Sequence, residues 1–199
     1  MASEQFRRPP HTRHLPPDAV LCPDLVPVTT VYENPWFAVR NRGGYFTTEY
    51  HLPQVIVLPV VADGGYVMVR AKRPVIGDTT LELPAGCADA GESPVAGAAR
   101  EFAEETGIAI ADLSRFIAMP PLSLLPNRMP KLIHMFRIDI SREEFDARTP
   151  HDNEIAAVSY VSYREAAGLI ADGEFYVALP VAIVASDLLS KIQLKQILI

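Results

Sequence analysis

Residues 86–108 read GCADAGESPVAGAAREFAEETGI, and this stretch carries the strongest structural and chemical signals in the chain. Its second half predicts a helix with clear ends. Ser93 suits the N-cap and Pro94 the first helical position, while Gly107 suits the residue that stops the helix. We therefore expect a helix that begins near Pro94 and ends just before Gly107.

Three carboxylates gather on one face of this predicted helix. Glu101, Glu104 and Glu105 stand at positions i, i+3 and i+4, whereas apolar residues occupy another face. Like charges this close weaken a helix by roughly 0.2–0.5 kcal/mol per pair unless something neutralises them. A solvated face is the ordinary explanation. The alternative is a hard cation, because Mg²⁺ and Mn²⁺ take carboxylate oxygens and complete their shell with water and phosphate oxygens.

The same stretch matches the Nudix signature, G-x5-E-x7-R-E-U-x-E-E-x-G-U with U a bulky apolar residue, at every defined position. The chain therefore resembles a Nudix hydrolase. This resemblance implies an α/β/α sandwich with a mixed β-sheet and a loop–helix–loop metal-binding motif. It also implies Mg²⁺ or Mn²⁺ as cofactor, held against a nucleoside diphosphate that is linked to a second group.

The resemblance assigns metal ligands within the motif. Glu101 and Glu105 resemble the principal ligands, and Glu104 resembles a further ligand or a group that orients water. The carbonyl of Ala85 lies where the family often offers a backbone oxygen to a metal. These four residues form the expected metal site.

The remaining motif residues are implied to support this site. Arg100 and Glu92 match an ion pair that supports the acidic helix. Gly86 is expected to permit a tight turn, and Gly107 to end the helix. Cys87 has no neighbouring base in the sequence and is expected only to fill space.

The flanking sequence, from about residue 53 to residue 188, is most similar to the ADP-ribose pyrophosphatase group and its nucleotide-sugar relatives. By this likeness, Arg73 contacts the substrate diphosphate and Glu82 lines the same pocket. Glu154, on a late loop, ligates metal when the site closes, and either Asp152 or Glu154 serves as general base. Without the resemblance, Arg73 and Glu154 would be ordinary surface residues.

Composition limits the partners. The chain has 199 residues, of which 49% are hydrophobic, and 18 Lys and Arg against 24 Asp and Glu give a formal net charge of −6. It therefore lacks the positive surplus that binds a nucleic-acid polymer or an anionic membrane. Cys22 and Cys87 form no disulfide framework or zinc pattern, and no apolar segment is long enough to be a membrane span. We expect a cytoplasmic protein that acts on a small anionic molecule.

Three regions are expected along the chain. Residues 1–28 predict a proline-rich N-terminal arm, since prolines remove backbone donors and favour extended conformations. Residues 29–52 predict an N-terminal β segment, and residues 53–199 the Nudix hydrolase domain. Similar Nudix proteins often pair through their N-terminal segments, which implies that the arm and the β segment form a homodimer.

Apolar runs and turn signals predict the other elements. Strands are expected over Thr29–Tyr32, Trp36–Arg40, Tyr45–Leu52, Gln54–Val61, Tyr66–Lys72, Thr80–Leu83, Lys131–Ile140 and Glu154–Val161. Ser162 and Glu165 form a capping box that opens a short helix, and an apolar helix from about Pro180 ends the chain. Strands and helices interleave without βαβ regularity, which predicts an α/β fold with a mixed sheet covered by helices on both faces.

The resemblance implies a metal-dependent hydrolase that splits the diphosphate bond of ADP-ribose or a related nucleoside diphosphate sugar. The products would be a nucleoside monophosphate and a sugar phosphate. Two alternatives stay open. The same fold could act on GDP-sugars, dinucleoside polyphosphates or oxidised nucleoside triphosphates. It could also be a non-catalytic domain that senses a nucleotide metabolite, although such domains are expected to lose motif carboxylates and none is missing here.

Overall fold

The computed structural model describes residues 16–149 and 153–197, with side chains through residue 192. The chain forms two compact units. The first contains the residues up to Pro53 together with Pro121–His134, and the second contains Gln54–Pro120 and the residues from Met135 onward. Residues 1–15 of the predicted arm lie outside the described residues. Within the described part, no helix has the length and apolar character needed to cross a membrane.

The first unit contains a three-stranded antiparallel sheet in the order β1 (Val28–Glu33), β2 (Phe37–Arg42) and β3 (Tyr45–Tyr50). Asn34 shapes the turn after β1, because its side-chain oxygen accepts hydrogen bonds from two following backbone amides. Gly43 and Gly44 form the turn after β2 with φ of 56° and 96°, values that a two-residue hairpin turn requires and glycine adopts without strain. The three strands predicted in this region are confirmed.

The second unit is built on a seven-stranded sheet. Its strands are β4 (Gln54–Val61), β5 (Gly65–Arg73), β6 (Asp78–Glu82), β7 (Ala85–Cys87), β8 (Ile117–Met119), β9 (His134–Ile140) and β10 (Ile155–Ser162). The path β10-β5-β4-β9-β8 runs through the sheet, while β6 pairs with β5 and β7 pairs with β4. β4 pairs with the start of β5, and β6 pairs with the end of β5. β7 lies next to the helix that carries the acidic motif.

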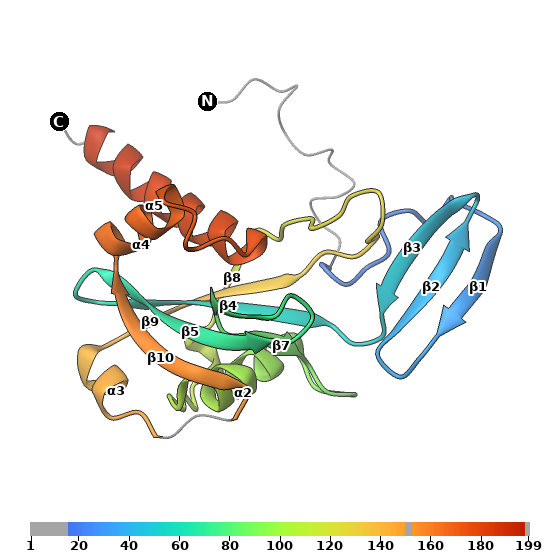
Figure 1. Ribbon diagram of the computed structural model, residues 1–199. Helices are drawn as coiled ribbons and strands as arrows, with labels where there is room; N and C mark the ends of the chain where they lie inside the picture. Colours follow the sequence, from blue (N-terminus) through green and yellow to red (C-terminus); the bar gives the residue numbers. More distant parts are fainter. Residues whose placement is uncertain (1–15, 150–152, 198–199) are drawn as a thin grey trace. The chain divides into compact units, whose positions relative to one another are not determined.

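Helices cover both faces of this sheet, as Figure 1 shows. They are α2 (Pro94–Thr106), α3 (Arg142–Asp146), α4 (Tyr163–Ala171) and α5 (Ala178–Ile197). α2 lies on one face, and α4 and α5 lie on the other (Figure 1). The predicted α/β sandwich with a mixed sheet is therefore confirmed.

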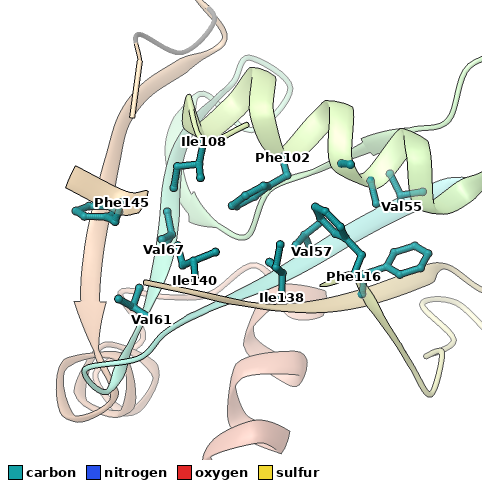
Figure 2. Close-up of a cluster of buried hydrophobic side chains, with 13 residues drawn as sticks. Val55, Val57, Val61, Val67, Phe102, Ile108, Phe116, Ile138, Ile140 and Phe145 are labelled. Carbon is teal, nitrogen blue, oxygen red and sulfur yellow. The ribbon is translucent and has the colours of Figure 1, made fainter. Parts of the chain in front are cut away.

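The main core lies between the sheet and α2. Val55 and Val57 of β4 point into it together with Phe102 of α2 and Ile138 of β9 (Figure 2). Phe102 and Ile138 are completely buried, and burying a side chain of this size stabilises a fold by roughly 1.5–3 kcal/mol. Alternate residues of a strand face opposite sides of the sheet. On β5, Tyr66 faces the side opposite to this core, where its hydroxyl donates a hydrogen bond to Asp187 of α5.

The ends of α2 agree with the prediction. The hydroxyl of Ser93 accepts a hydrogen bond from the amide of Ala96, Pro94 occupies the first turn, and Gly107 has a left-handed φ of 72°. A Cβ on Gly107 would also lie 1.9 Å from the carbonyl oxygen of Thr149. Glycine is therefore required at this C-cap for both backbone conformation and space.

Four short elements were not predicted from the sequence: β7, β8, α3 and the 3-10 turn at Leu113–Arg115. The three residues of β7 were expected to be loop, and they form a strand because β4 supplies a partner at Gln54–Ile56. The helix α3 begins with a capping box in which Ser141 and Glu144 exchange side-chain-to-backbone hydrogen bonds. The capping box of α3 is visible in the sequence, whereas the formation of β7 depends on a tertiary partner.

Candidate active site

The acidic face of α2 lies against the backbone of β7. Glu105 is buried, and its Oε2 accepts a hydrogen bond from the amide of Ala85 at 2.9 Å. Glu101 is half-buried, and its Oε1 accepts from the amide of Cys87 at 3.3 Å. The amides of the first and last residues of β7 thus hold two carboxylates of the helix. The acidic face is not a solvated one at these two positions.

Gly86, between those two amides, allows this approach. A Cβ built on Gly86 would lie 2.2 Å from Cδ of Glu101 and 2.4 Å from its Oε1. Gly86 belongs to β7 and is not among the positive-φ glycines of the described chain. The need for glycine therefore comes from the closeness of a carboxylate, rather than from a special turn conformation.

Arg100 connects four oxygen acceptors at the start of the site. Its Nη1 donates to Glu101 Oε1 at 3.1 Å and to Glu104 Oε2 at 3.0 Å. Its Nη2 donates to the carbonyl of Cys87 at 2.7 Å and to Glu92 Oε2 at 3.2 Å. The guanidinium thereby ties the motif loop to the first turns of the acidic face.

Burial and neighbouring charges have opposite effects on the pKa values of Glu101 and Arg100. Burial raises the pKa of the Glu101 carboxyl above its usual range, although the charge of Arg100 and the amide of Cys87 act in the other direction. The amide of Asp89 and then Arg100 lower the pKa of Glu92. Burial by itself lowers the pKa of the Arg100 guanidinium. The hydrogen bond from Arg100 to Glu92 and the charges of the nearby carboxylates outweigh this effect, so the pKa of Arg100 is raised overall. The site therefore contains a carboxylate that would gain from additional positive charge.

A second pair of predicted residues lies across β5 and β6. Arg73 donates from Nε to Glu82 Oε1 at 2.7 Å and from Nη2 to Oε2 at 3.0 Å, a two-point geometry that fixes the guanidinium plane. Glu82 is buried and also accepts from the hydroxyl of Thr80. The Glu82 hydrogen bond is the main reason that the pKa of Arg73 is raised, and the charges of Glu105 and Glu154 add to it. Arg73 therefore interacts electrostatically with Glu105 of the acidic helix.

Glu154 lies immediately before β10. The amide of Lys72 donates to the carbonyl of Glu154 at 3.1 Å, and Nζ of Lys72 donates to the carbonyl of Asn153 at 2.6 Å. Two donors of one residue thus hold the backbone on which Glu154 sits. Asp152, the other residue expected as general base, lies outside the described residues.

The donor set suits a hard divalent cation. Glu101, Glu104, Glu105 and the carbonyl of Ala85 offer oxygen atoms only, which is the preference of Mg²⁺ and Mn²⁺. Among residues 16–149 and 153–197, no three acidic, histidine or cysteine side chains are gathered closely enough to hold an ion. Arg100 instead supplies positive charge to the oxygens of Glu101 and Glu104.

Sequence reasoning missed two contributors to the site. Cys87 was expected only to fill space, yet its amide holds Glu101 and its carbonyl holds Arg100. Lys72 was not singled out, although it holds the segment of Glu154. Cys87 acts through its backbone atoms and Lys72 acts on a distant backbone carbonyl, so neither role has a local signal in the sequence. Only the pairing of strands could have indicated them.

Comparisons with known proteins show the family to which the chain is similar. A family model of the NUDIX domain matches residues 50–179. The chain is 30% identical over 126 residues to ADP-ribose pyrophosphatase of Bacillus subtilis, an alignment that covers 63% of this chain and 66% of that protein. It is 36% identical over 114 residues to phosphatase NudJ of Escherichia coli K12, over 57% of this chain and 71% of that protein. A crystal structure of an ADP compounds hydrolase has the same fold, with a TM-score of 0.60 and 19% identity over 86% of this chain and 94% of that one.

Proposed function

Because the chain belongs to the Nudix family, we propose that it hydrolyses the diphosphate bond of ADP-ribose or a related nucleoside diphosphate sugar to a nucleoside monophosphate and a sugar phosphate. The observation that carries this proposal is the acidic face of α2, where β7 holds Glu101 and Glu105 beside Arg100. The similarity to ADP-ribose pyrophosphatase of Bacillus subtilis supports the choice of substrate.

The proposed cofactor is Mg²⁺ or Mn²⁺, held by Glu101, Glu104, Glu105 and the carbonyl of Ala85. When bound, such an ion neutralises diphosphate oxygens and makes water a stronger acid. Glu154 is proposed to join this ligand set, since its charge already acts on Arg73 beside the acidic helix.

The remaining residues are given proposed roles, and the contacts of Arg73 and Arg100 support theirs. Glu82 occupies Nε and Nη2 of Arg73, which leaves Nη1 to donate to a substrate phosphate oxygen. Arg100 keeps the motif loop and the helix together through Cys87 and Glu92. Glu154 or Asp152 accepts the proton of the attacking water, which then adds to one phosphorus as the other phosphate leaves.

A second candidate substrate class is suggested by the similarity to phosphatase NudJ of Escherichia coli. The same site would then act on a phosphate group of a different compound, such as a GDP-sugar, a dinucleoside polyphosphate or an oxidised nucleoside triphosphate. A non-catalytic sensor is disfavoured, because every carboxylate of the motif is present and two of them are held by β7.

The experiment is a hydrolysis panel with and without Mg²⁺ or Mn²⁺, using these compounds and ADP-ribose in ¹⁸O-labelled water. We expect ADP-ribose or another nucleotide sugar to be cleaved fastest, with the label identifying the attacked phosphorus. Glu105→Gln should lower turnover at least ~10²-fold, because it removes a charge from the metal site while Gln can still accept from Ala85. Unchanged turnover in this variant would exclude the site.

We further propose a cytoplasmic homodimer. The free state of both cysteines supports a reducing compartment. The first unit exposes several large apolar side chains, including Val31, Tyr32, Trp36 and Phe46, and an apolar surface of this kind is typical of subunit contacts. Light scattering tests the dimer. A molar mass that corresponds to one chain would refute the dimer.

A further inference from the structure

The first unit contains a cavity of about 460 Å³ that has no part in the proposed reaction. Its walls come from two segments of the same unit and from β3. Residues 21–25 and 123–132 provide most of the lining, and Tyr45 and Thr47 of β3 provide the remainder. The volume lies in the range of small-molecule sites.

The walls are held in place by backbone hydrogen bonds. The amide of Leu21 donates to the carbonyl of Pro130 at 2.8 Å, and the amide of Leu132 donates to Pro17 at 2.6 Å. The amide of Thr48 in β3 donates to the carbonyl of Arg128 at 2.8 Å. The two segments are thus tied to each other and to the sheet. A ligand would meet a preformed cavity and would not have to order its walls.

The lining is mainly apolar and contains one cation. Leucine, proline and methionine make up half of the lining residues, and Arg128 is the only charged residue among those that line the cavity. Its Nη1 donates to the neighbouring carbonyl of Asn127, and no ion pair of Arg128 occurs within the described residues. Glu49, which accepts a hydrogen bond from the lining residue Thr47, is paired with Arg42 through hydrogen bonds of 2.6 and 2.9 Å.

We propose that this cavity binds a small molecule with an apolar body and one anionic group, a carboxylate or a phosphate that pairs with Arg128. A guanidinium binds either group through two parallel hydrogen bonds, while the apolar walls favour a hydrocarbon or aromatic body. A nucleotide sugar does not fit this description, because it carries several charges and a polar sugar. The site is therefore separate in chemistry from the acidic helix.

The two cysteines of the chain provide a built-in test. Cys22 lines the cavity, whereas Cys87 lies in β7 of the other unit. Labelling of the full chain by N-ethylmaleimide is followed by peptide mass spectrometry, with octanoate or octyl phosphate as the probe. We expect either or both anions to slow the labelling of Cys22 in a saturable way and to leave Cys87 unaffected. The comparison between the two probes identifies the preferred anionic group, and octanol should protect at least ~10-fold more weakly because it lacks the charge-assisted hydrogen bond.

Variants distinguish a site from general hydrophobic binding. Arg128→Met should weaken the protection of Cys22 at least ~10-fold, and Arg128→Lys should restore part of it. Arg164→Met, which removes one charge from an exposed position of α4, should bind like the unmodified chain. Equal protection by octanol, equal protection in Arg128→Met, or protection that depends on protein concentration instead of ligand concentration would overturn the proposal.

Discussion

Replacing Gly86 by alanine should damage the chemistry of the site while leaving the fold intact. The new Cβ would stand 2.2 Å from Cδ of Glu101, and ordinary contact requires a separation of about 3.5 Å or more. The carboxylate must therefore move by more than ~1 Å. A misplacement of this size at a reacting centre costs on the order of 10²-fold in rate, which corresponds to about 2.7 kcal/mol in the barrier.

The stability cost of the same substitution should be small. The atoms in the way belong to the end of a flexible side chain, and Gly86 has no left-handed φ that alanine would strain. The displaced carboxylate loses hydrogen bonds from Cys87 and Arg100, each of which contributes roughly 0.5–1.5 kcal/mol net or somewhat more for the charged donor. Part of this loss is offset, because moving Glu101 outward relieves the burial that raises its pKa.

Gly97 provides the matched control. A Cβ there would lie 2.7 Å from both Cα and Cβ of Ala88, and a backbone atom cannot swing aside as a glutamate can. Overpacking of this kind costs about 1–3 kcal/mol, which exceeds the ~1 kcal/mol that alanine adds to a helix. Gly97→Ala should therefore lower the thermal midpoint more than Gly86→Ala does.

The assay combines steady-state kinetics on the substrate that the panel selects, calorimetric titration with Mn²⁺ and thermal unfolding. We expect Gly86→Ala to lose about two orders of magnitude in kcat/KM and to bind Mn²⁺ more weakly, with a nearly unchanged thermal midpoint. If kcat/KM and Mn²⁺ affinity both stay at the level of the unmodified chain, the position of the Glu101 carboxylate against β7 has no role in catalysis.

Two further predictions address the support of the site and of the fold. Lys72→Met should lower kcat/KM roughly 10-fold, because it releases the segment that carries Glu154, and Lys72→Arg should restore part of the activity. Arg70→Met, which removes an exposed cation two residues earlier on β5, should have no effect. Equal loss of kcat/KM in Lys72→Met and Arg70→Met would refute a specific role of Lys72. Glu144→Gln should destabilise the chain at neutral pH, because hydrogen bonds from Arg115 hold the pKa of the Glu144 carboxyl below its usual range. The stabilisation by the Glu144 carboxylate is present above its unfolded-state pKa and disappears as pH falls through its folded-state pKa. The unfolding curves of the variant and the unmodified chain should therefore converge in acid. A difference in stability that does not depend on pH would contradict the role assigned to Glu144.

The helix of the motif was predictable because its signals are local. Ser93, Pro94 and Gly107 each act within a few residues of chain, and all three stand where their chemistry places them. The strand Gln54–Val61 was likewise predicted with its observed bounds, since continuous apolar residues between turn signals suffice to indicate a buried strand.

The contacts that complete the site were not predictable in this way. The role of the Cys87 backbone requires that β7 lie beside α2, and the grip of Lys72 on Asn153 joins residues that are 81 positions apart. The ties between residues 17–21 and 130–132 in the first unit are of the same kind. Each depends on register and strand order, which a single sequence specifies only weakly.

The two faces of α2 explain how an acidic site can be kept in place. Repulsion among three neighbouring carboxylates costs roughly 0.2–0.5 kcal/mol per pair, and holding Glu105 in a buried position adds to that cost. Burial of Phe102 on the opposite face contributes about 1.5–3 kcal/mol by itself, and Ala98 packs completely buried beside it. The core face of the helix therefore outweighs the strain of the acidic face. Glu105 and Glu101 stay held against β7, and Arg100 supplies positive charge to Glu101 and Glu104.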